Sequence, residues 1–283
     1  ANVKVLFQNN INCVFKAKVR RHGDFKDHIE LRNGNIIQSL DVHLKNGHIN
    51  GITKFKLLLP KTRGNPDDEI ILTEIFRSLN IMAPRTFYVT LNNQPKKSRM
   101  LFQEKASKEL LEFNKRKESV ILEGDERYLY DDDLNHFTNS AYHFSLSKIS
   151  NKKLIDKNPA YRKIIINSVA LLNEFYLETL NHYIAENQYD YDYSKIQNLL
   201  LDRSKTKILG GKNDIYNNLI FATNSIHSLI PHNRKFYWNA EYQSFEPIYY
   251  DGNSNILAPL NIEKLPKNKN FFRTLNTTLD LFN

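Results

Sequence analysis

The chain has 283 residues, of which 41% are hydrophobic and 25% charged, so it is long and apolar enough for one large domain or for two lobes that share a cleft. These values exclude a mainly disordered chain, and the single cysteine, Cys13, excludes an intrachain disulfide and a cysteine-based metal site. The formal net charge of +9 favours anionic partners, such as phosphates, nucleic acid, acidic polymers or a membrane surface, without choosing among them.

The first part of the chain is predicted to be rich in β-strands. Short apolar or alternating runs occupy residues 3–7, 14–19 and 55–59, and turn dipeptides such as Asn46-Gly47 separate them. Residues 67–79 begin with carboxylates and carry apolar residues at helical spacing, which predicts a helix. Two further strands, 86–91 and 99–103, complete a β-rich unit that we place at residues 1–104.

After Glu104 the pattern changes to helical spacing. Residues 106–117 and 160–185 are predicted to be helices, and residues 160–185 carry a wide apolar stripe. Residues 214–229 are predicted to be another helix, or a helix that runs into a loop. Two short strands, 235–238 and 246–250, are joined by a polar turn. We therefore expect an α+β fold in which a small β-rich lobe (1–104) faces a larger, mainly helical lobe (105–283) across a cleft.

The segment from His227 to Asn253 is the most informative for chemistry. It places polar loop residues, among them Asn233, ahead of the predicted hairpin, and the second strand leads directly into Asp251-Gly252. The hairpin brings the loop asparagine and the strand-end aspartate to one edge, and their oxygen atoms are the ligands that Mg²⁺ prefers. A surface hairpin with Asp-Gly as a simple turn is the alternative.

Together with other segments in the same chain order, this stretch resembles the CotH-like atypical protein kinases of spore coats and, more distantly, the HipA-like kinases. The resemblance covers most of the chain. The segments that carry it are residues 19–24, 56–60, 69–85, 92–104 and 224–233, followed by Asp251.

The resemblance implies a two-lobed kinase-like fold and an enzyme that transfers the γ-phosphate of ATP, with Mg²⁺ or Mn²⁺, to a protein Ser or Thr or to another hydroxyl acceptor. It implies metal ligands at Asp251 and Asn233; His227, near them in the sequence, is the candidate base that this chain itself offers. For the nucleotide site it implies Lys56 or Lys54 on a strand, with Glu69, or failing that Glu74, orienting that lysine from the helix that follows. It also implies Glu104 and Lys105 at the connector, and Arg21 and Gly23 in a turn.

One position departs from the family's pattern. The related kinases carry an aspartate several residues before the metal-binding asparagine, and Ser228 stands there in this chain, beside His227. His227 titrates near neutral pH and can accept a proton, although a structural histidine is the alternative. Two other functions therefore stay open: a pseudokinase that binds nucleotide or acts as a scaffold, and, less favoured, a basic protein that binds nucleic acid or an acidic polymer.

The expected partners are a nucleotide and an unidentified protein or small-molecule acceptor, and nucleic acid is not expected. No apolar run is long enough to span a bilayer. The lack of a cysteine pair favours a reducing compartment, so we expect a cytoplasmic protein. Because the chain begins with Ala1 instead of Met, an exported or surface-associated form with a processed N-terminus is the alternative.

Overall fold

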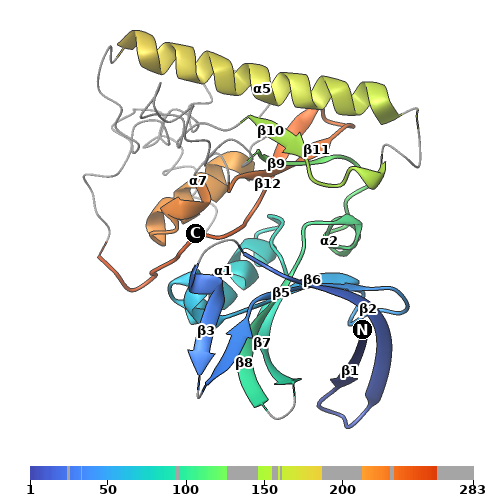
Figure 1. Ribbon diagram of the computed structural model, residues 1–283. Helices are drawn as coiled ribbons and strands as arrows, with labels where there is room; N and C mark the ends of the chain where they lie inside the picture. Colours follow the sequence, from blue (N-terminus) through green and yellow to red (C-terminus); the bar gives the residue numbers. More distant parts are fainter. Residues whose placement is uncertain are drawn as a thin grey trace.

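Two antiparallel sheets account for most of the strands in the computed structural model of the chain (Figure 1). The structure describes residues 1–23, 26–32, 34–93, 96–125, 146–154, 159, 161–186, 212–229 and 233–259.

The first part of the chain forms a six-stranded sheet that curls around an apolar core. Phe15 and Ala17 on the second strand are buried while their neighbours are exposed, which is the period-two pattern of a strand with one face covered. The strands are, in sheet order, β1 (Asn2–Leu6), β2 (Asn12–Arg21), β5 (Leu40–Leu44), β6 (Lys54–Leu58), β8 (Lys96–Glu104) and β7 (Thr86–Asn93). Between β2 and β5 lie the 3-10 turn η1 (Lys26–His28) and the hairpin of β3 (Ile29–Arg32) and β4 (Asn35–Gln38).

Helix α1 (Pro66–Ser78) follows β6 and the 3-10 turn η2 (Pro60–Arg63), and it starts at a defined cap. The side chain of Asn65 accepts a hydrogen bond from the backbone N–H of Asp67, and proline occupies the first helical position. The cap fixes where the helix begins, and so fixes the position of Glu69 in its first turn. The helix predicted over residues 67–79 is confirmed.

The second part of the chain contains a four-stranded antiparallel sheet covered by a long helix. Apolar side chains of α5, among them Leu172 and Phe175, pack with Phe236, Trp238 and Phe245 from the sheet in one buried cluster. The strands are, in sheet order, β10 (Ser147–Ile149), β9 (Ile121–Gly124), β11 (Lys235–Asn239) and β12 (Ser244–Ile248). The helices are α2 (Lys108–Phe113), α5 (Tyr161–Glu186) and α7 (Lys212–Ala222), with a 3-10 turn η5 (Ile226–Leu229).

An apolar cluster joins the two parts of the chain. It packs Leu72 and Phe76 of α1 against Tyr216 and Ile220 of α7 and against Tyr249. The backbone also crosses the boundary, because the N–H of Tyr249 donates to the carbonyl of Met82 at 2.9 Å. The segment after β12 is therefore held against the first part of the chain.

The expected fold class, a kinase-like pair of lobes with a larger and mainly helical second lobe, is wrong. Among the described residues, strand exceeds helix, only four α-helices occur, and the second part is built on a sheet. Strands β9 and β10 have four and three residues, which is too short to show a period in the sequence. The helix expected over residues 106–117 is only the six residues of α2, because Lys115 adopts a left-handed φ of 56° soon after it.

None of the helices in the described ranges is both long enough and apolar enough to cross a membrane.

Candidate functional site

A cavity of about 810 Å³ lies between the outer face of the six-stranded sheet and the four-stranded sheet; we call it the cleft. Strands β2, β5 and β6 line one side, and β9, β10, the start of β11 and Tyr249-Tyr250 line the other. Eleven of the lining residues are Lys or Arg, against five Asp or Glu. A cleft with this balance of charge attracts an anionic ligand and raises its local concentration.

Lys56 lies at the inner end of the cleft, on β6, and only 9% of it is exposed. Its Nζ donates a hydrogen bond to the Tyr250 Oη at 2.6 Å and lies 4.8 Å from the centre of that ring. Burial lowers the pKa of Lys56 because it disfavours the charged ammonium. No carboxylate in the described part of the chain forms an ion pair with Lys56, and its hydrogen-bond partner in the structure is the Tyr250 Oη.

Tyr250 is surrounded by cations. The Lys235 Nζ lies 4.4 Å from the ring centre and the Arg63 guanidinium carbon 5.5 Å from it, in addition to Lys56. Burial alone would raise the pKa of the Tyr250 phenol, but the charges of Lys56, Arg63 and Lys235 outweigh it and lower the pKa. The inner end of the cleft therefore stabilises negative charge on an oxygen atom.

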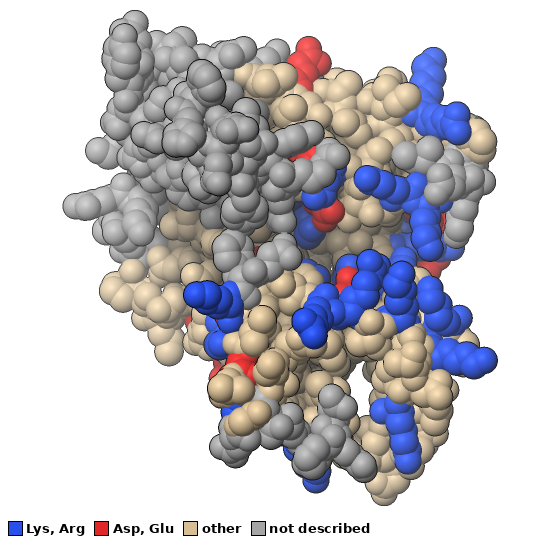
Figure 2. Space-filling view, viewed as in Figure 1, with Lys and Arg blue, Asp and Glu red and all other residues tan. Residues whose placement is uncertain are grey.

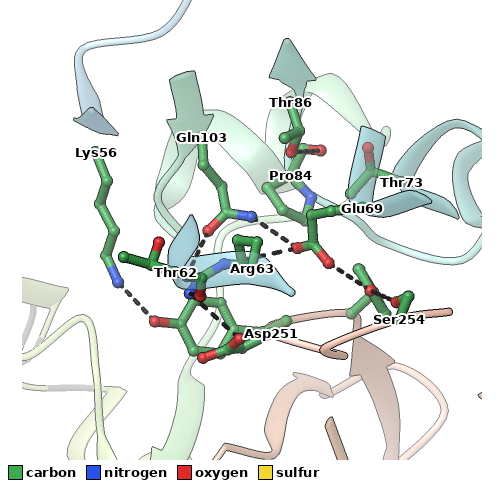
Figure 3. A network of polar contacts seen from close by, with 12 residues as sticks. Lys56, Thr62, Arg63, Glu69, Thr73, Pro84, Thr86, Gln103, Asp251 and Ser254 are labelled. Carbon is green, nitrogen blue, oxygen red and sulfur yellow. Dashed lines mark hydrogen bonds and ion pairs between the residues drawn. The ribbon is translucent and has the colours of Figure 1, made fainter. Parts of the chain in front are cut away.

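Beside Tyr250, Arg63 bridges two carboxylates from different parts of the chain (Figure 3). Its Nη1 lies 3.2 Å from the Asp251 Oδ1, and its Nε lies 3.9 Å from the Glu69 Oε1. Gln103 links to both, since it accepts from the Arg63 Nη2 at 3.2 Å and donates to Glu69 at 2.9 Å. The Arg63 and Glu69 side chains are 3% and 0% exposed, so this is a buried ionic network.

Asp251 follows β12 with a left-handed φ of 51°, and Gly252 comes next. A side chain on Gly252 would overlap the Tyr249 hydroxyl and the side chains of Ser254 and Ser225, so only glycine fits there. Burial would raise the pKa of the Asp251 carboxyl, but Arg63 and His227 hold it well below its usual range. The Asp251 carboxylate is therefore ionised at neutral pH.

His227 and Asn233 lie next to Asp251. The His227 Nδ1 lies 2.8 Å from the Asp251 carbonyl oxygen, as a donor, and 3.7 Å from the Asp251 Oδ1. The Asn233 Nδ2 donates to the His227 carbonyl at 3.2 Å and contacts its ring. Burial lowers the pKa of His227, but its contacts with Asp251 outweigh burial and raise the pKa. The structure thus brings together the three residues that the sequence proposed as catalytic.

The proposed nucleotide contacts are only partly brought together. Lys54 lies two residues before Lys56 on β6 and lines the cleft with it. Lys105 also lines the cleft, but its Nζ pairs with Asp41 at 2.9 Å. Glu69 was expected to orient the strand lysine; it pairs instead with Arg63, whose guanidinium reaches the start of α1 from the turn just before it.

The remaining three positions do not present a free group to the cleft. Both Glu104 carboxylate oxygens accept hydrogen bonds from the Arg85 guanidinium, at 2.8 and 2.6 Å, so this residue is structural. Arg21 is exposed at the end of β2, and Gly23 has a left-handed φ of 87° with the His28 ring against it. Neither Arg21 nor Gly23 lines the cleft; their neighbour His22 does.

Sequence reasoning missed Arg63, Tyr249 and Tyr250. Three consecutive residues, Tyr249, Tyr250 and Asp251, each reach a different residue of the first part: Glu69 at 2.6 Å, Lys56 at 2.6 Å and Arg63 at 3.2 Å. The sequence did contain a signal for the tyrosines. They stand directly before the proposed metal aspartate, and in an extended chain two adjacent side chains point to opposite sides.

The oxygen atoms of Asp251 and Asn233 fit a metal ion in kind. The carboxylate is ionised, pairs with the Arg63 guanidinium and has the His227 ring beside it. Within the described residues, no group of three or more His, Cys, Asp or Glu could hold a metal ion. Two oxygen donors are fewer than a cage made of protein alone needs; Mg²⁺ is commonly bound through one or two protein carboxylates, with phosphate and water as its other ligands.

No protein-family model matches the chain, and no curated protein matches it either. Its function must be inferred from the chemistry of the cleft.

Proposed function

We propose that this protein binds a nucleoside triphosphate, with ATP as the expected one, at the inner end of the cleft and transfers its γ-phosphate to a hydroxyl acceptor. Buried Lys56, which lacks a carboxylate partner among the described residues, carries this proposal. A buried charge is normally paired, and a phosphate would supply the missing anion. Lys235, whose Nζ also lies over Tyr250, would contact the same phosphates.

Asp251 and Asn233 would hold the Mg²⁺ or Mn²⁺ that such a nucleotide carries, and the bound metal would neutralise phosphate charge. In the transfer, the acceptor oxygen forms a bond to the γ-phosphorus while the bond from that phosphorus to the bridging oxygen breaks, and the nucleoside diphosphate leaves. His227, whose side chain is 40% exposed, would take the hydroxyl proton. Ser228 is not a base here, because its buried hydroxyl donates to the Ser225 carbonyl at 2.9 Å.

Binding is tested by the change in melting temperature on adding ATP and Mg²⁺, in the wild type and in Lys56→Met and Asp251→Asn variants. We expect the wild type to be stabilised and both variants to lose the response. Glu241→Ala is the matched control, because it removes a carboxylate that pairs with Lys117 on the surface. An unchanged response in Lys56→Met would contradict the assignment of Lys56 to phosphate.

A second candidate is nucleotide binding without transfer, as in a scaffold protein. The observation that favours it is the residue pair at the transfer position: the buried Ser228 hydroxyl donates to the Ser225 carbonyl, and the His227 Nδ1 is already bonded to the Asp251 carbonyl oxygen. Incubation with γ-labelled ATP and a serine-containing acceptor separates the two. Label that moves in the wild type and not in Asp251→Asn supports transfer, and nucleotide binding without label movement supports the scaffold.

A further inference from the structure

The outer end of the cleft carries more positive charge than a triphosphate at the inner end would use. Six side chains form what we call the outer basic row. They are Lys18 and Arg20 on β2, Lys45 just after β5, Lys54 on β6, and Lys152 and Lys153 just after β10. Figure 2 shows Lys and Arg side chains gathered above the six-stranded sheet, on the side that faces the second sheet.

Strand register places part of this row side by side. Lys18 on β2 is opposite His43 on β5, and His43 is opposite Lys54 on β6. Two lysines thus flank a histidine across three adjacent strands, so an anion that lies over these strands can contact Lys18 and Lys54 together.

The acids of the cleft do not neutralise the row. Among the described residues, no ion pair joins Lys18, Arg20, Lys45, Lys54, Lys152 or Lys153 to a carboxylate, because the acidic groups are engaged elsewhere. Asp41 pairs with Lys105, Glu104 with Arg85, Glu123 with Lys235, Glu118 with Lys108, and Glu109 hydrogen-bonds Thr53 and Ser107.

Lysines on both sides of the cleft lower the pKa of the same residue, His43. Burial lowers the pKa of His43, and the charges of Lys45, Lys54 and Lys153 lower it further, while Glu109 opposes them. Lys45 and Lys54 belong to the six-stranded sheet, and Lys153 follows β10 of the second sheet. The positive potential therefore spans the width of the cleft.

We propose that the outer basic row binds an acidic polypeptide segment. Adjacent strands lie about 4.8 Å apart and an extended chain advances about 3.4 Å per residue, so roughly three to four residues cross from β2 to β6. Two acidic residues in such a stretch can meet the lysines on both strands. A segment bound there could also carry the hydroxyl that accepts phosphate. That role rests on the proposed function, whereas binding of the segment to the outer basic row does not.

Single-stranded nucleic acid is the less favoured polyanion. Proteins that bind it combine a basic groove with aromatic faces on which bases stack. The aromatic residues that line the cleft are Tyr249, which is fully buried, and Tyr250, which is covered by cations at the inner end; the histidines aside, the described lining of the outer end has none. The row therefore offers charge without stacking platforms.

The test measures fluorescence anisotropy of a labelled twelve-residue peptide that alternates Glu and Ser, without nucleotide or metal. A peptide with Gln in place of Glu, and a twelve-residue oligothymidylate, are measured in parallel. The variant is Lys18→Glu with Lys45→Glu, both exposed, and the control is Lys4→Glu with Lys115→Glu, which removes the same charge outside the cleft.

We expect the acidic peptide to bind the wild type, the double variant to weaken binding by about tenfold or more, and the control to change it less than about twofold. Equal binding by the wild type and the double variant would overturn the proposal. So would tighter binding of the oligonucleotide, which would make the row a nucleic-acid surface. Asp251→Asn should keep peptide binding while it loses the nucleotide response, so failure of one proposal is distinguishable from failure of the other.

Discussion

Arg63 is the residue on which the buried ionic network depends. Its guanidinium contacts both Glu69, from α1, and Asp251, from the segment after β12. Removal of one partner from a buried ion pair is costly because it leaves the other charge without compensation.

We therefore expect Arg63→Met to lower the free energy of unfolding by about 3–5 kcal/mol, measured by urea denaturation at neutral pH. The control is Arg32→Met, which removes an exposed pair with Glu30 and should cost less than about 1 kcal/mol. A loss below about 1 kcal/mol for Arg63→Met would show that water or relaxation compensates the two carboxylates.

The interaction of His227 with Asp251 predicts a pH dependence. Because the folded-state pKa of His227 is raised, the stability that it contributes is fully present below the unfolded-state pKa and is lost as pH rises through the folded-state pKa. The difference in unfolding free energy between the wild type and His227→Gln should therefore be larger at pH 6 than at pH 9. A difference that does not change with pH would mean that His227 stays neutral in the folded protein.

The same raised pKa bears on transfer. If His227 takes the hydroxyl proton, it must be unprotonated, so turnover should rise with pH through its pKa, and His227→Gln should remove that rise. Unchanged turnover in His227→Gln would remove this residue from the mechanism.

At the scale of elements, the cap of α1 sets the position of Glu69. Asn65→Ala removes the side-chain acceptor for the Asp67 N–H and should cost about 1 kcal/mol of stability in urea denaturation. Asn65→Ser keeps an acceptor and should cost a few tenths of that. Equal losses in the two variants would mean that the proline after Asn65, and not the hydrogen bond, fixes the start of the helix.

Local patterns predicted some elements and not others. The strands over 55–59, 86–91 and 99–103 and the helices over 67–79 and 160–185 have enough residues to show a period, and they are present as β6, β7, β8, α1 and α5. Strand β9 pairs with β11, more than a hundred residues later, and no local sequence pattern at β9 predicts this pairing. The mistaken mainly helical second lobe follows from that long-range pairing.

The candidate site could be predicted only in part for a similar reason. Asp251, Asn233 and His227 lie within 25 residues of one another, so a loop and a hairpin bring them together. Arg63 and Asp251 are far apart in the sequence, and their contact exists only because the core packs α1 against α7 and Tyr249. A lone arginine between two prolines gave no sign of this role.

At the scale of the whole molecule, the cleft has an inner end that is buried and an outer end that is open to solvent. Salt screens exposed charges strongly and buried charges weakly. Raising NaCl from about 50 to about 500 mM should therefore weaken acidic-peptide binding by about tenfold or more, and nucleotide binding by only a few-fold. Calorimetric titration measures both, with sucrose at equal osmolality as the control, and equal sensitivity would mean that both ligands share the exposed lysines.

Three polar side chains of the segment Tyr249–Asp251 attach the second part of the chain to the first. One of them, Tyr250, contacts the Lys56 amine, which is the group proposed to bind phosphate. The Lys56 ammonium has three N–H donors and gives one of them to the Tyr250 hydroxyl, so a phosphate could bind Lys56 while that contact is kept. The ligand would then touch both parts of the chain and strengthen their attachment, whereas Tyr250→Phe removes one of the three contacts before any ligand binds.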